Sequence, residues 1–573
     1  CAKAYQLIGK SMRNLNQINQ SHIFFEKAIG LDPNNLEILK DAGNTYQLIG
    51  ENNMASKFYL KALEIDKKYA PALTNLGSIQ WLEGNIEIAL QLHRSASKYD
   101  PKLIAAWVNL CNVCFQLNLV KEADDSIRKA ILLKPKCQTM QFGLIKKLAI
   151  SCNWTLLKSN LYWLDDPIFA LEHSPFFLMN LFYKPYSFLK LSELFYKNHI
   201  QDIHTTIETK KKDKIRIGYI SNDFYYHSVM HLMSRVIELH DRSKFEVYIY
   251  DFGIHQTDEM TERIKSAADE YRMVKDLSNE DLVQQVREDE IDVAIDLMGY
   301  TRHHRAIIFS NRVAPIQINM QGYPGTTGSD SMDYILADKC LIRKGEEKYY
   351  TEKVIRMPFT SQAMDDTLAP STRVFTREEL GIKDDSFVFC CFAKPEKIQR
   401  TEFQIWMNLL KQREESVLWL LESNRWAKEN ILKETKESGV DPSRIIFSQK
   451  VSIEDHMSRQ ACADLELDTF NFSAGTMTFL ALTTGLPILT MPGQTFSSRL
   501  TASVLNSIGL EDELVASNEK DYEAKALKLS ESRSNTEELS KKIMSLKRTA
   551  PYFSSENYCR NFEDEIYKIF YEI

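Results

Sequence analysis

Small and hydrophobic residues recur every 34 positions over the first part of the chain. One phase holds Gly9, Gly43, Gly77 and Cys111, and another holds Ala28, Ala62, Ala96 and Ala130. A third holds Asn16, Gly50, Gly84 and Asn118, residue types that tolerate the left-handed turn after a helix. This spacing predicts helix–turn–helix units in which small residues mark the contact of two helices. The sequence therefore predicts an α-solenoid over residues 1–137, with three full repeats after a partial first one.

The repeat resembles the tetratricopeptide repeat, whose units stack into a superhelix with a concave groove. Asp41, Asn75 and Asn109 share one phase, just before the small-residue position. A ladder of such side chains inside the groove would hold the backbone of an extended peptide. The alternative is that they are ordinary polar residues of the helix surface. By itself the repeat implies a protein-binding module.

Residues 138–212 carry no repeat and are rich in Leu, Phe, Tyr and Trp, which predicts a helical connector. Strand-like apolar runs then alternate with helical patterns, which argues for mostly parallel sheets. The first set indicates a lobe over residues 213–370, with strands expected near 214–220, 245–251, 292–298, 316–321, 334–337 and 354–357. The second set indicates a lobe over residues 371–550, with strands expected at 387–392, 417–421, 445–448, 463–467 and 487–491. Residues 551–573 close the chain with an amphipathic helix that would bury Tyr558, Phe562, Ile566 and Phe570.

Candidate chemistry in the first lobe follows the expected strand ends. His227 comes just after the first strand, where a histidine acts as a general base, positions a substrate or is simply structural. The loop of small residues at 322–328, GYPGTTG, follows another strand. Its backbone at Pro324 and Gly325 would approach a sugar or phosphate, and Thr326 would offer a hydroxyl; a plain tight turn is the alternative. Tyr300 and Thr301 end a further strand and are expected at the same cleft.

Cationic groups follow strands of the second lobe. Lys394 and Lys397 come after its first strand, and His456 and Arg459 lie three apart on one helix face, a cationic pair able to grip a diphosphate. Small residues at 473–476 open a helix, whose N-terminus offers free amides to a phosphate. Each basic residue taken singly is typical of a solvated surface charge. Together they favour an anionic ligand, with a nucleotide as the first choice, in the cleft between the lobes.

Composition narrows the class of protein. The net charge of −7 and a pI near 6.0 give no support for nucleic acid or an anionic membrane as partner. No apolar run reaches the roughly 18 residues of a transmembrane helix, so no membrane span is expected. Ten scattered cysteines suit a reducing compartment, and we expect a cytoplasmic protein. The chain starts at Cys1, so an incomplete N-terminus stays open.

Several motifs together resemble one known family. They are SNDFYYHSVMHLM, DLMGYT, APIQINMQGYPGTTGSDSMDYILAD, KIQRTEFQIWMNLL, SRIIFSQ, LDTF, GLPILTMPG and SSRLTAS. With the repeats, they resemble the tetratricopeptide-containing O-linked N-acetylglucosamine transferases and the related SPINDLY proteins, which are O-fucosyltransferases. The resemblance covers nearly the whole chain and is nearest to short bacterial members. It implies a GT-B fold, two Rossmann-like lobes holding a nucleotide-sugar donor, and an inverting transfer to Ser or Thr hydroxyls without a metal or cofactor.

The resemblance also implies roles for single residues. His227 matches the family histidine proposed as base, and Lys397 matches the lysine that contacts the donor diphosphate. The remaining matches cover the donor and sugar pockets: His456 and Arg459 at the uridine end, Thr476 at the diphosphate, and Pro324 and Gly325 at the sugar. The proton of the acceptor hydroxyl goes to His227, to water or to the donor phosphate; the sequence does not choose.

The chain departs from the family pattern at several donor-site positions. Leu480 stands where the family has a ribose-binding carboxylate, and Ile453 replaces a lysine. Gly475, Met477 and Lys394 replace a histidine, a threonine and a glutamine. The resemblance implies UDP-N-acetylglucosamine as the donor, and these departures leave GDP-fucose or another UDP-sugar as the alternative. A repeat scaffold with an inactive transferase domain is the third possibility.

Overall fold

The structure is a computed structural model, and it describes residues 1–14, 18–117, 119–134, 138–161, 174–182, 184–200, 207–208 and 212–571. The chain divides into two compact units, Cys1–Lys147 and Leu148–Ile573. No helix among the described residues combines the length and the apolar character that crossing a membrane requires.

The first unit is a run of antiparallel helix pairs in which helices of 13 and 14 residues alternate. The pairs are α1 (Ala2–Asn14) and α2 (Ile18–Leu31), α3 (Leu36–Leu48) and α4 (Asn52–Ile65), α5 (Ala70–Leu82) and α6 (Ile86–Tyr99), and α7 (Ile104–Gln116) and α8 (Val120–Leu133). Helix α9 (Gln138–Ile150) follows them. The first pair is as long as the others, so the expectation of a partial first repeat is wrong. The predicted helical solenoid is confirmed.

The 34-residue phases have a direct physical cause. A Cβ built on Gly43 would lie 2.4 Å from the ring of Tyr59, and one on Gly77 would lie 2.8 Å from the ring of His93. The aromatic ring of the second helix thus occupies the space that a side chain on the first would need. Gly84 lies in the turn between α5 and α6 and has a φ of +85°, a conformation that favours glycine.

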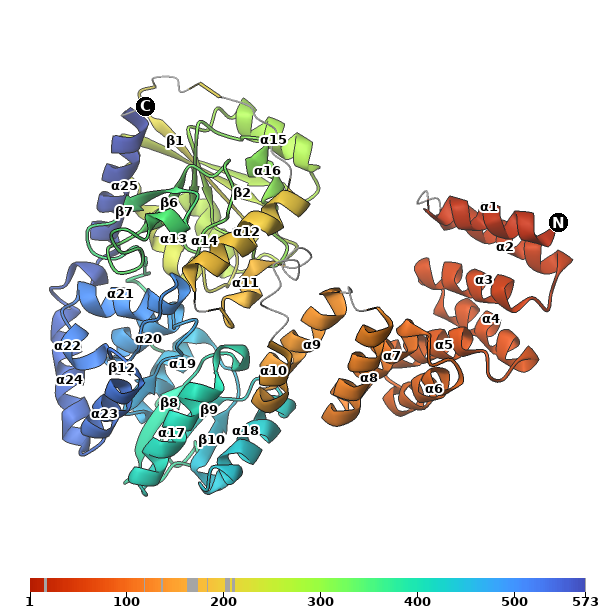
Figure 1. Cartoon of the computed structure of the whole chain (residues 1–573). Coiled ribbons are helices and arrows are strands. Elements are labelled where there is room, and N and C mark those ends of the chain that lie inside the picture. Colours follow the sequence, from red (N-terminus) through yellow and green to blue (C-terminus); the bar gives the residue numbers. More distant parts are fainter. Residues whose placement is uncertain are drawn as a thin grey trace. The chain divides into compact units, whose positions relative to one another are not determined.

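The second unit begins with helices and continues into two parallel sheets (Figure 1). The leading helices are α10 (Trp154–Asn160), α11 (Pro175–Leu178) and α12 (Pro185–His199). The first sheet has seven strands in the order β3-β2-β1-β4-β5-β6-β7. Their bounds are β1 (Ile215–Ser221), β2 (Phe245–Asp251), β3 (Glu270–Met273), β4 (Val293–Asp296), β5 (Ile316–Asn319), β6 (Tyr334–Ala337) and β7 (Lys353–Arg356). The helices between them are α13 (Met230–Leu239), α14 (Glu259–Ala267), α15 (Asn279–Glu288) and α16 (Ile307–Ser310).

The second sheet has five strands in the order β10-β9-β8-β11-β12. Their bounds are β8 (Phe387–Cys391), β9 (Ser416–Leu421), β10 (Ile445–Ser448), β11 (Leu465–Leu467) and β12 (Ile488–Leu489). The helices are α17 (Arg400–Gln412), α18 (Arg425–Glu437), α19 (Ile453–Arg459), α20 (Thr476–Thr484), α21 (Leu500–Ser507), α22 (Glu511–Leu514), α23 (Glu519–Leu529), α24 (Arg533–Leu546) and α25 (Ser555–Tyr571). Every strand pair of the described chain is parallel, so the predicted α/β class with two lobes is confirmed.

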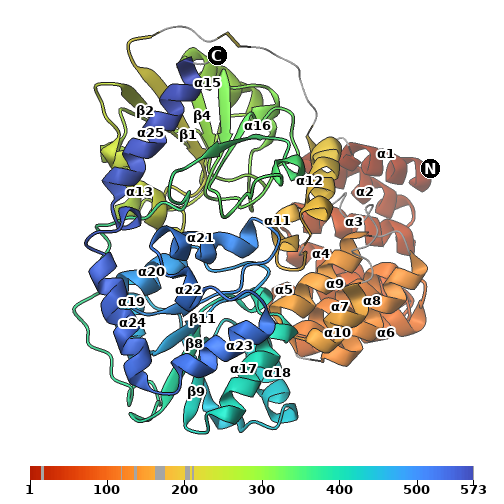
Figure 2. The same cartoon turned by 60° about the vertical axis from the view of Figure 1, so that its left-hand side comes forward.

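The last helix returns to the first lobe and lies beside α13 (Figures 1 and 2). The four apolar residues expected to face inward on it are all buried: Tyr558, Phe562, Ile566 and Phe570. Helix α25 therefore ties the end of the second lobe to the sheet of the first.

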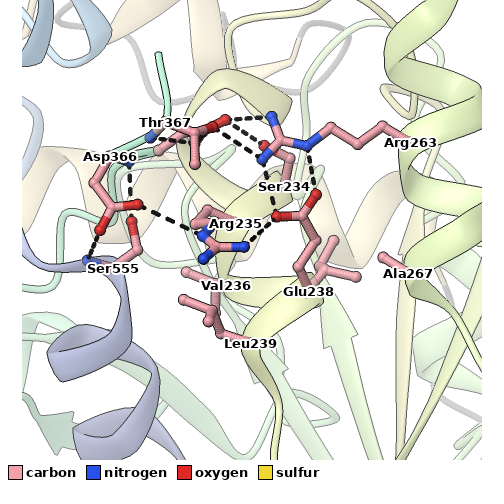
Figure 3. A network of polar contacts seen from close by, with 12 residues as sticks. Ser234, Arg235, Val236, Glu238, Leu239, Arg263, Ala267, Asp366, Thr367 and Ser555 are labelled. Atoms are coloured by element: carbon pink, nitrogen blue, oxygen red, sulfur yellow. Dashed lines mark hydrogen bonds and ion pairs between the residues drawn. The ribbon is translucent and has the colours of Figure 1, made fainter.

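A polar network fixes the segment that crosses between the lobes (Figure 3). Asp365 is fully buried; its carboxylate accepts hydrogen bonds from Ser234 at 3.0 Å and from Arg263. The neighbouring Asp366 accepts from the backbone N–H of Ser555 at 3.0 Å, at the first residue of α25. The crossing segment is thus held by α13, α14 and α25 at once.

Candidate active site

Lys397 lies on a single 3₁₀ turn after β8, at the carboxyl end of the second sheet. Its Nζ is 3.7 Å from the centre of the Phe472 ring and 3.4 Å from the carbonyl oxygen of Ser473. Burial lowers the pKa of Lys397 to about 8. In the described part of the chain no carboxylate forms an ion pair with this ammonium group. A cation in such surroundings is ready to receive an anion.

The start of α20 lies on the same side of the sheet. Gly475 is its N-cap residue and Thr476 its first residue. The preceding loop is held by Asp468, which accepts from the backbone N–H of Ala474 at 2.7 Å and from the Thr490 hydroxyl at 2.7 Å. Lys397 and the free amides of α20 together form a positive site, because a helix N-terminus carries partial positive charge. Asp468, which organises this loop, is not among the predicted site residues, although an acid at the end of a buried strand is a usable signal.

His456 and Arg459 are brought together on α19, but not as two cations. Arg459 Nε donates to Nδ1 of His456 at 3.0 Å, so that ring nitrogen carries no proton. Burial and the neighbouring guanidinium lower the pKa of His456 to about 3. The expected cationic pair is therefore one buried cation beside a neutral ring. Both residues are buried, so the interpretation as solvated surface charges is wrong too.

Aromatic side chains surround the imidazole of His456, and such surroundings suit the flat ring of a ligand. Its imidazole packs edge-on against Phe392 with ring centres 4.7 Å apart, and Arg459 lies over both Phe392 and Trp419. His456 Nε2 is buried and has no hydrogen-bond partner among the described residues. With Nδ1 accepting, Nε2 carries the proton and is a free donor. Lys394, three residues before Lys397, is exposed.

The first lobe contributes His227, in the loop between β1 and α13. Its Nδ1 lies 3.3 Å from a carboxylate oxygen of Asp223. Burial lowers the pKa of His227 to about 4 and raises that of Asp223 to about 7, so the ring is neutral at neutral pH. The charges of Lys394 and Lys450, both from the second lobe, add to the effect on His227.

Two contacts join this loop to the second lobe. The hydroxyl of Tyr226 donates to Glu454, at the start of α19. The hydroxyl of Thr476 reaches the carbonyl oxygen of Ser228 at 3.5 Å. The loop that carries His227 therefore contacts the start of α20, and the residue Ser473 just before that helix contacts Lys397. Asp223 and Glu454 are not among the predicted residues, because their roles depend on contacts that residue types alone do not reveal.

The loop GYPGTTG is more tightly packed than expected. Thr326 donates its hydroxyl to Glu352 at 2.6 Å, so this group is already engaged. A Cβ on Gly325 would lie 2.6 Å from the Phe188 ring. Tyr300 is buried and donates to the carbonyl oxygen of Thr327 at 2.6 Å. These hydroxyls serve the fold of the loop, which corrects the expectation that the Thr326 hydroxyl is a free donor.

Three predicted residues of the first lobe lie next to residues of the second lobe. Pro324, Gly325 and Thr326 line a hollow together with Thr495 and Ser497 of the second lobe. The hydroxyl of Thr301 lies 3.8 Å from the sulfur of Met298, which is not a predicted site residue. In the described chain this hydroxyl has no hydrogen bond with a predicted site residue.

The three apolar replacements in the predicted donor region lie in the core or against it. Leu480 is buried in the large core of the unit, and Ile453 and Met477 pack against that core. None of these three side chains offers a hydrogen bond.

The ladder residues of the first unit lie in successive repeats and are hydrogen-bonded between them. Asn75 donates to Asn44 at 2.7 Å, and Asn109 donates to Ser78 at 3.0 Å. Asp41 is buried and pairs with Lys10 at 2.7 Å. All three thus join neighbouring repeats.

One group of side chains has the composition of a metal site. His240, Cys559 and Glu563 bring ligand atoms within 4.8 Å of one another. His240 bonds to Glu563 at 3.0 Å and to the Tyr219 hydroxyl at 2.7 Å, and Glu563 also pairs with Arg560. These contacts account for the group as an anchor of α25 on the first lobe.

The fold and this site define a two-lobed α/β protein with a positively charged site at the carboxyl end of its second sheet, preceded by helical repeats. The model of glycosyl transferase family 41 matches residues 190–369 and 359–562, which is more than half of the chain. The chain therefore belongs to this family. The tetratricopeptide repeat model matches residues 2–35 and 41–69.

Two proteins named as peptide N-acetylglucosaminyltransferases are similar in sequence to the chain. A probable UDP-N-acetylglucosamine–peptide N-acetylglucosaminyltransferase SEC of Arabidopsis thaliana is 30% identical over 362 residues, covering 62% of this chain and 37% of that protein. The UDP-N-acetylglucosamine–peptide N-acetylglucosaminyltransferase of Caenorhabditis elegans is 25% identical over 489 residues, covering 65% and 42%. The chain thus spans about two fifths of the length of these relatives.

A solved structure shows the same fold over nearly the whole chain. A mutant of the O-GlcNAc transferase of Thermobaculum terrenum superposes with a TM-score of 0.67 and 24% identity. The match covers 93% of this chain and 97% of that one. The order of repeats followed by two α/β lobes, predicted from the sequence, is confirmed.

Proposed function

We propose that the chain transfers N-acetylglucosamine from UDP-N-acetylglucosamine to serine and threonine hydroxyls of proteins. The observation that carries the proposal is the Lys397 ammonium, which has no carboxylate partner among the described residues and lies beside the start of α20. Such a site suits the diphosphate of a nucleotide sugar. The names of the plant and nematode relatives support the choice of donor.

The reaction follows from the groups on the two sides of the cleft. The acceptor oxygen attacks the anomeric carbon while the bond from that carbon to the diphosphate oxygen breaks, so the configuration inverts. The electron pair of the broken bond stays on UDP. Lys397 and the amides of α20 stabilise the added negative charge, which is greater in the transition state than in the donor.

His227 is the proposed base for the acceptor proton. Its ring is neutral at neutral pH because burial lowers its pKa to about 4. Nδ1 lies 3.3 Å from an Asp223 carboxylate oxygen and 3.4 Å from the backbone N–H of Val229. In the tautomer that donates a hydrogen bond from Nδ1 to ionised Asp223, Nε2 carries no proton and takes the proton of the hydroxyl. Water or the donor phosphate is the competing acceptor for that proton.

The remaining roles are assigned by position. We assign the uracil ring to the neutral His456 and to Arg459, and the peptide acceptor to the repeat groove near Asp41, Asn75 and Asn109. Two positive groups at the diphosphate do the work that a divalent cation does elsewhere, so we propose transfer without a metal. All cysteines of the described chain are free, which supports a cytoplasmic location.

Calorimetric titration in EDTA tests the donor. UDP and UDP-N-acetylglucosamine are compared with GDP and GDP-fucose, on the wild-type chain and on Lys397→Met. Binding of the uridine ligands, reduced at least about tenfold in the variant, is the expected result. A preference for GDP would assign the fucose donor instead, and no binding of any of the four would refute the proposal in favour of an inactive scaffold.

A further inference from the structure

A second histidine lies beside the loop that carries His227. His255 follows β2, and its Nε2 lies 3.2 Å from a carboxylate oxygen of Asp251, the last residue of that strand. Asp251 is fully buried, and it also accepts hydrogen bonds from the Tyr271 hydroxyl and from the backbone N–H of Gly253. The loop after β2 thus turns back on itself and holds this imidazole against the end of the strand.

The same imidazole packs against the loop that follows β1. It stacks on the Tyr225 ring, with ring centres 4.6 Å apart and an angle of 25° between the planes. The Tyr225 ring in turn lies 5.5 Å from the ring of His227. A Cβ on Gly253 would lie 2.2 Å from Cδ2 of His255 and 2.6 Å from the carbonyl oxygen of Asn222, so glycine is needed for this close packing. The ring of His255 is therefore fixed against the loop that carries His227.

The contacts of His255 favour a ring with a proton on each nitrogen. Its Nε2 faces the Asp251 carboxylate, and its Nδ1 lies 3.2 Å from the carbonyl oxygen of Gln256. Both partners are acceptors, and only the imidazolium form donates to two acceptors at once. A positive charge at this place favours the ionised form of a neighbouring carboxylate.

Asp223 is the carboxylate next to this charge. It is buried, and burial raises its pKa to about 7. The charge of His255 acts against that rise, whereas the charge of Asp251 adds to it. Asp223 thus titrates near neutral pH, and a change in the charge of His255 shifts the pH at which it ionises.

The two tautomers of His227 differ in the contacts of its Nδ1. With a proton, Nδ1 donates to ionised Asp223. Without a proton, Nδ1 accepts from the backbone N–H of Val229 at 3.4 Å or from protonated Asp223. Only the first tautomer leaves Nε2 without a proton. The ionisation of Asp223 therefore decides whether His227 takes the proton of the acceptor hydroxyl.

Titratable groups from the neighbouring elements also face these two histidines. They are Asp258 at the start of α14 and Tyr271 of β3 near His255, and His231 of α13 with Lys394 and Lys450 of the second lobe near His227. A substitution of His255 leaves all of these groups in place. A change in the pH dependence of such a variant therefore reports on the charge of His255 itself.

We propose that His255 is a positioning residue: its charge keeps Asp223 ionised and so holds His227 in the tautomer that takes the hydroxyl proton. The inference rests on the proposed function, because it concerns the base of that reaction. The pH profile of kcat/KM should have an acid limb, on which the rate rises with pH as Asp223 ionises. Its midpoint in the wild type should be near pH 7.

The test compares the pH profiles of kcat/KM for transfer between about pH 5.5 and 9.5 in the wild type and three variants. His255→Gln keeps a donor for Asp251 without the charge, and His255→Phe keeps a flat ring for stacking on Tyr225. The matched control is His303→Gln, the same change at an exposed histidine of the first lobe. UDP affinity and Tm are measured for all four chains.

Both His255 variants are expected to move the acid limb up by about one pH unit or more, because a positive charge beside Asp223 is lost. At about pH 6 this is a fall of about tenfold in kcat/KM, whereas at about pH 9 the rate should return to within about threefold of the wild type. UDP affinity should be unchanged, and His303→Gln should leave the limb in place.

The contrary outcomes separate this role from the proposed function. An acid limb that is absent from the wild type, or that stays in place in both His255 variants, would overturn the role of His255 and leave the proposed function standing. An equal loss of rate at every pH would do the same, since a purely structural role has that effect. Absence of transfer by the wild type at every pH would refute the proposed function and this assignment together.

Discussion

Replacing Lys397 by methionine separates its charge from its bulk. The shift of its pKa from 10.5 to about 8 means that the folded protein holds this ammonium at a cost of about 3 kcal/mol. Within the described chain, the hydrogen bond of this group is the long one to Ser473, at 3.4 Å. Lys397→Met should therefore fold with a Tm equal to or above that of the wild type. The same change should lower kcat by about 10²–10³-fold, since one group that stabilises the leaving diphosphate is lost.

The pH dependence of this prediction has a definite sign. The folded pKa of Lys397 is below its unfolded value, so the cost of the charge is fully present below pH 8 and disappears as the pH rises toward 10.5. Wild-type stability should rise relative to the variant across that window. Donor affinity should fall over the same window, because the neutral amine does not bind the diphosphate.

Steady-state kinetics with UDP-N-acetylglucosamine and thermal unfolding at about pH 7–10 check both statements. Lys394→Met is the matched control, because that lysine is exposed and its charge is screened by water. It should lose less than about tenfold in kcat. A Lys397→Met chain with full turnover, or one that loses less than Lys394→Met, would refute the reasoning.

Three further changes test other parts of the account. Arg459→Met should weaken UDP binding by about tenfold or more in calorimetry, since a buried donor to the neighbouring ring is lost; unchanged affinity would remove this residue from the donor site. Gly43→Ala should destabilise the repeat unit by about 1–3 kcal/mol in thermal unfolding, whereas Gly30→Ala, with no atom within 4 Å, should be neutral or stabilising; equal effects would contradict the packing argument. Asp365→Asn should destabilise the second unit by about 3 kcal/mol at pH 7, because Arg263 loses a buried charged partner. The Asp365 pKa is lowered, so the wild type's advantage should disappear as the pH falls below about 4; an advantage that persists there would contradict the ion pair.

Strands with an apolar run were predictable even where they are short, and the mostly polar edge strand β3 was not. β2, β6 and β10 have the bounds expected from the sequence. β3 (Glu270–Met273) was missed because it lies at the sheet edge and carries mostly polar residues. The strand expected over 487–491 is reduced to β12, Ile488–Leu489, since the prolines on either side cannot donate to a neighbouring strand.

The sequence predicts where the candidate residues lie better than it predicts their protonation and hydrogen bonding. Lys397 and Thr476 follow strand ends, and the carboxyl edge of a parallel sheet gathers such residues. The neutrality of His456 depends on a 3.0 Å contact with Arg459, which residue types alone do not reveal. The engaged hydroxyl of Thr326 depends on Glu352, distant in sequence.

The most direct test of the central claim is transfer itself. The chain is incubated with UDP-N-acetylglucosamine and a cytoplasmic protein extract in EDTA, and modified serine and threonine residues are mapped by mass spectrometry. The account predicts N-acetylglucosamine on those hydroxyls with the wild type and almost none with Lys397→Met. Modification at equal levels with both chains, or with neither while GDP-fucose supports transfer, would contradict it.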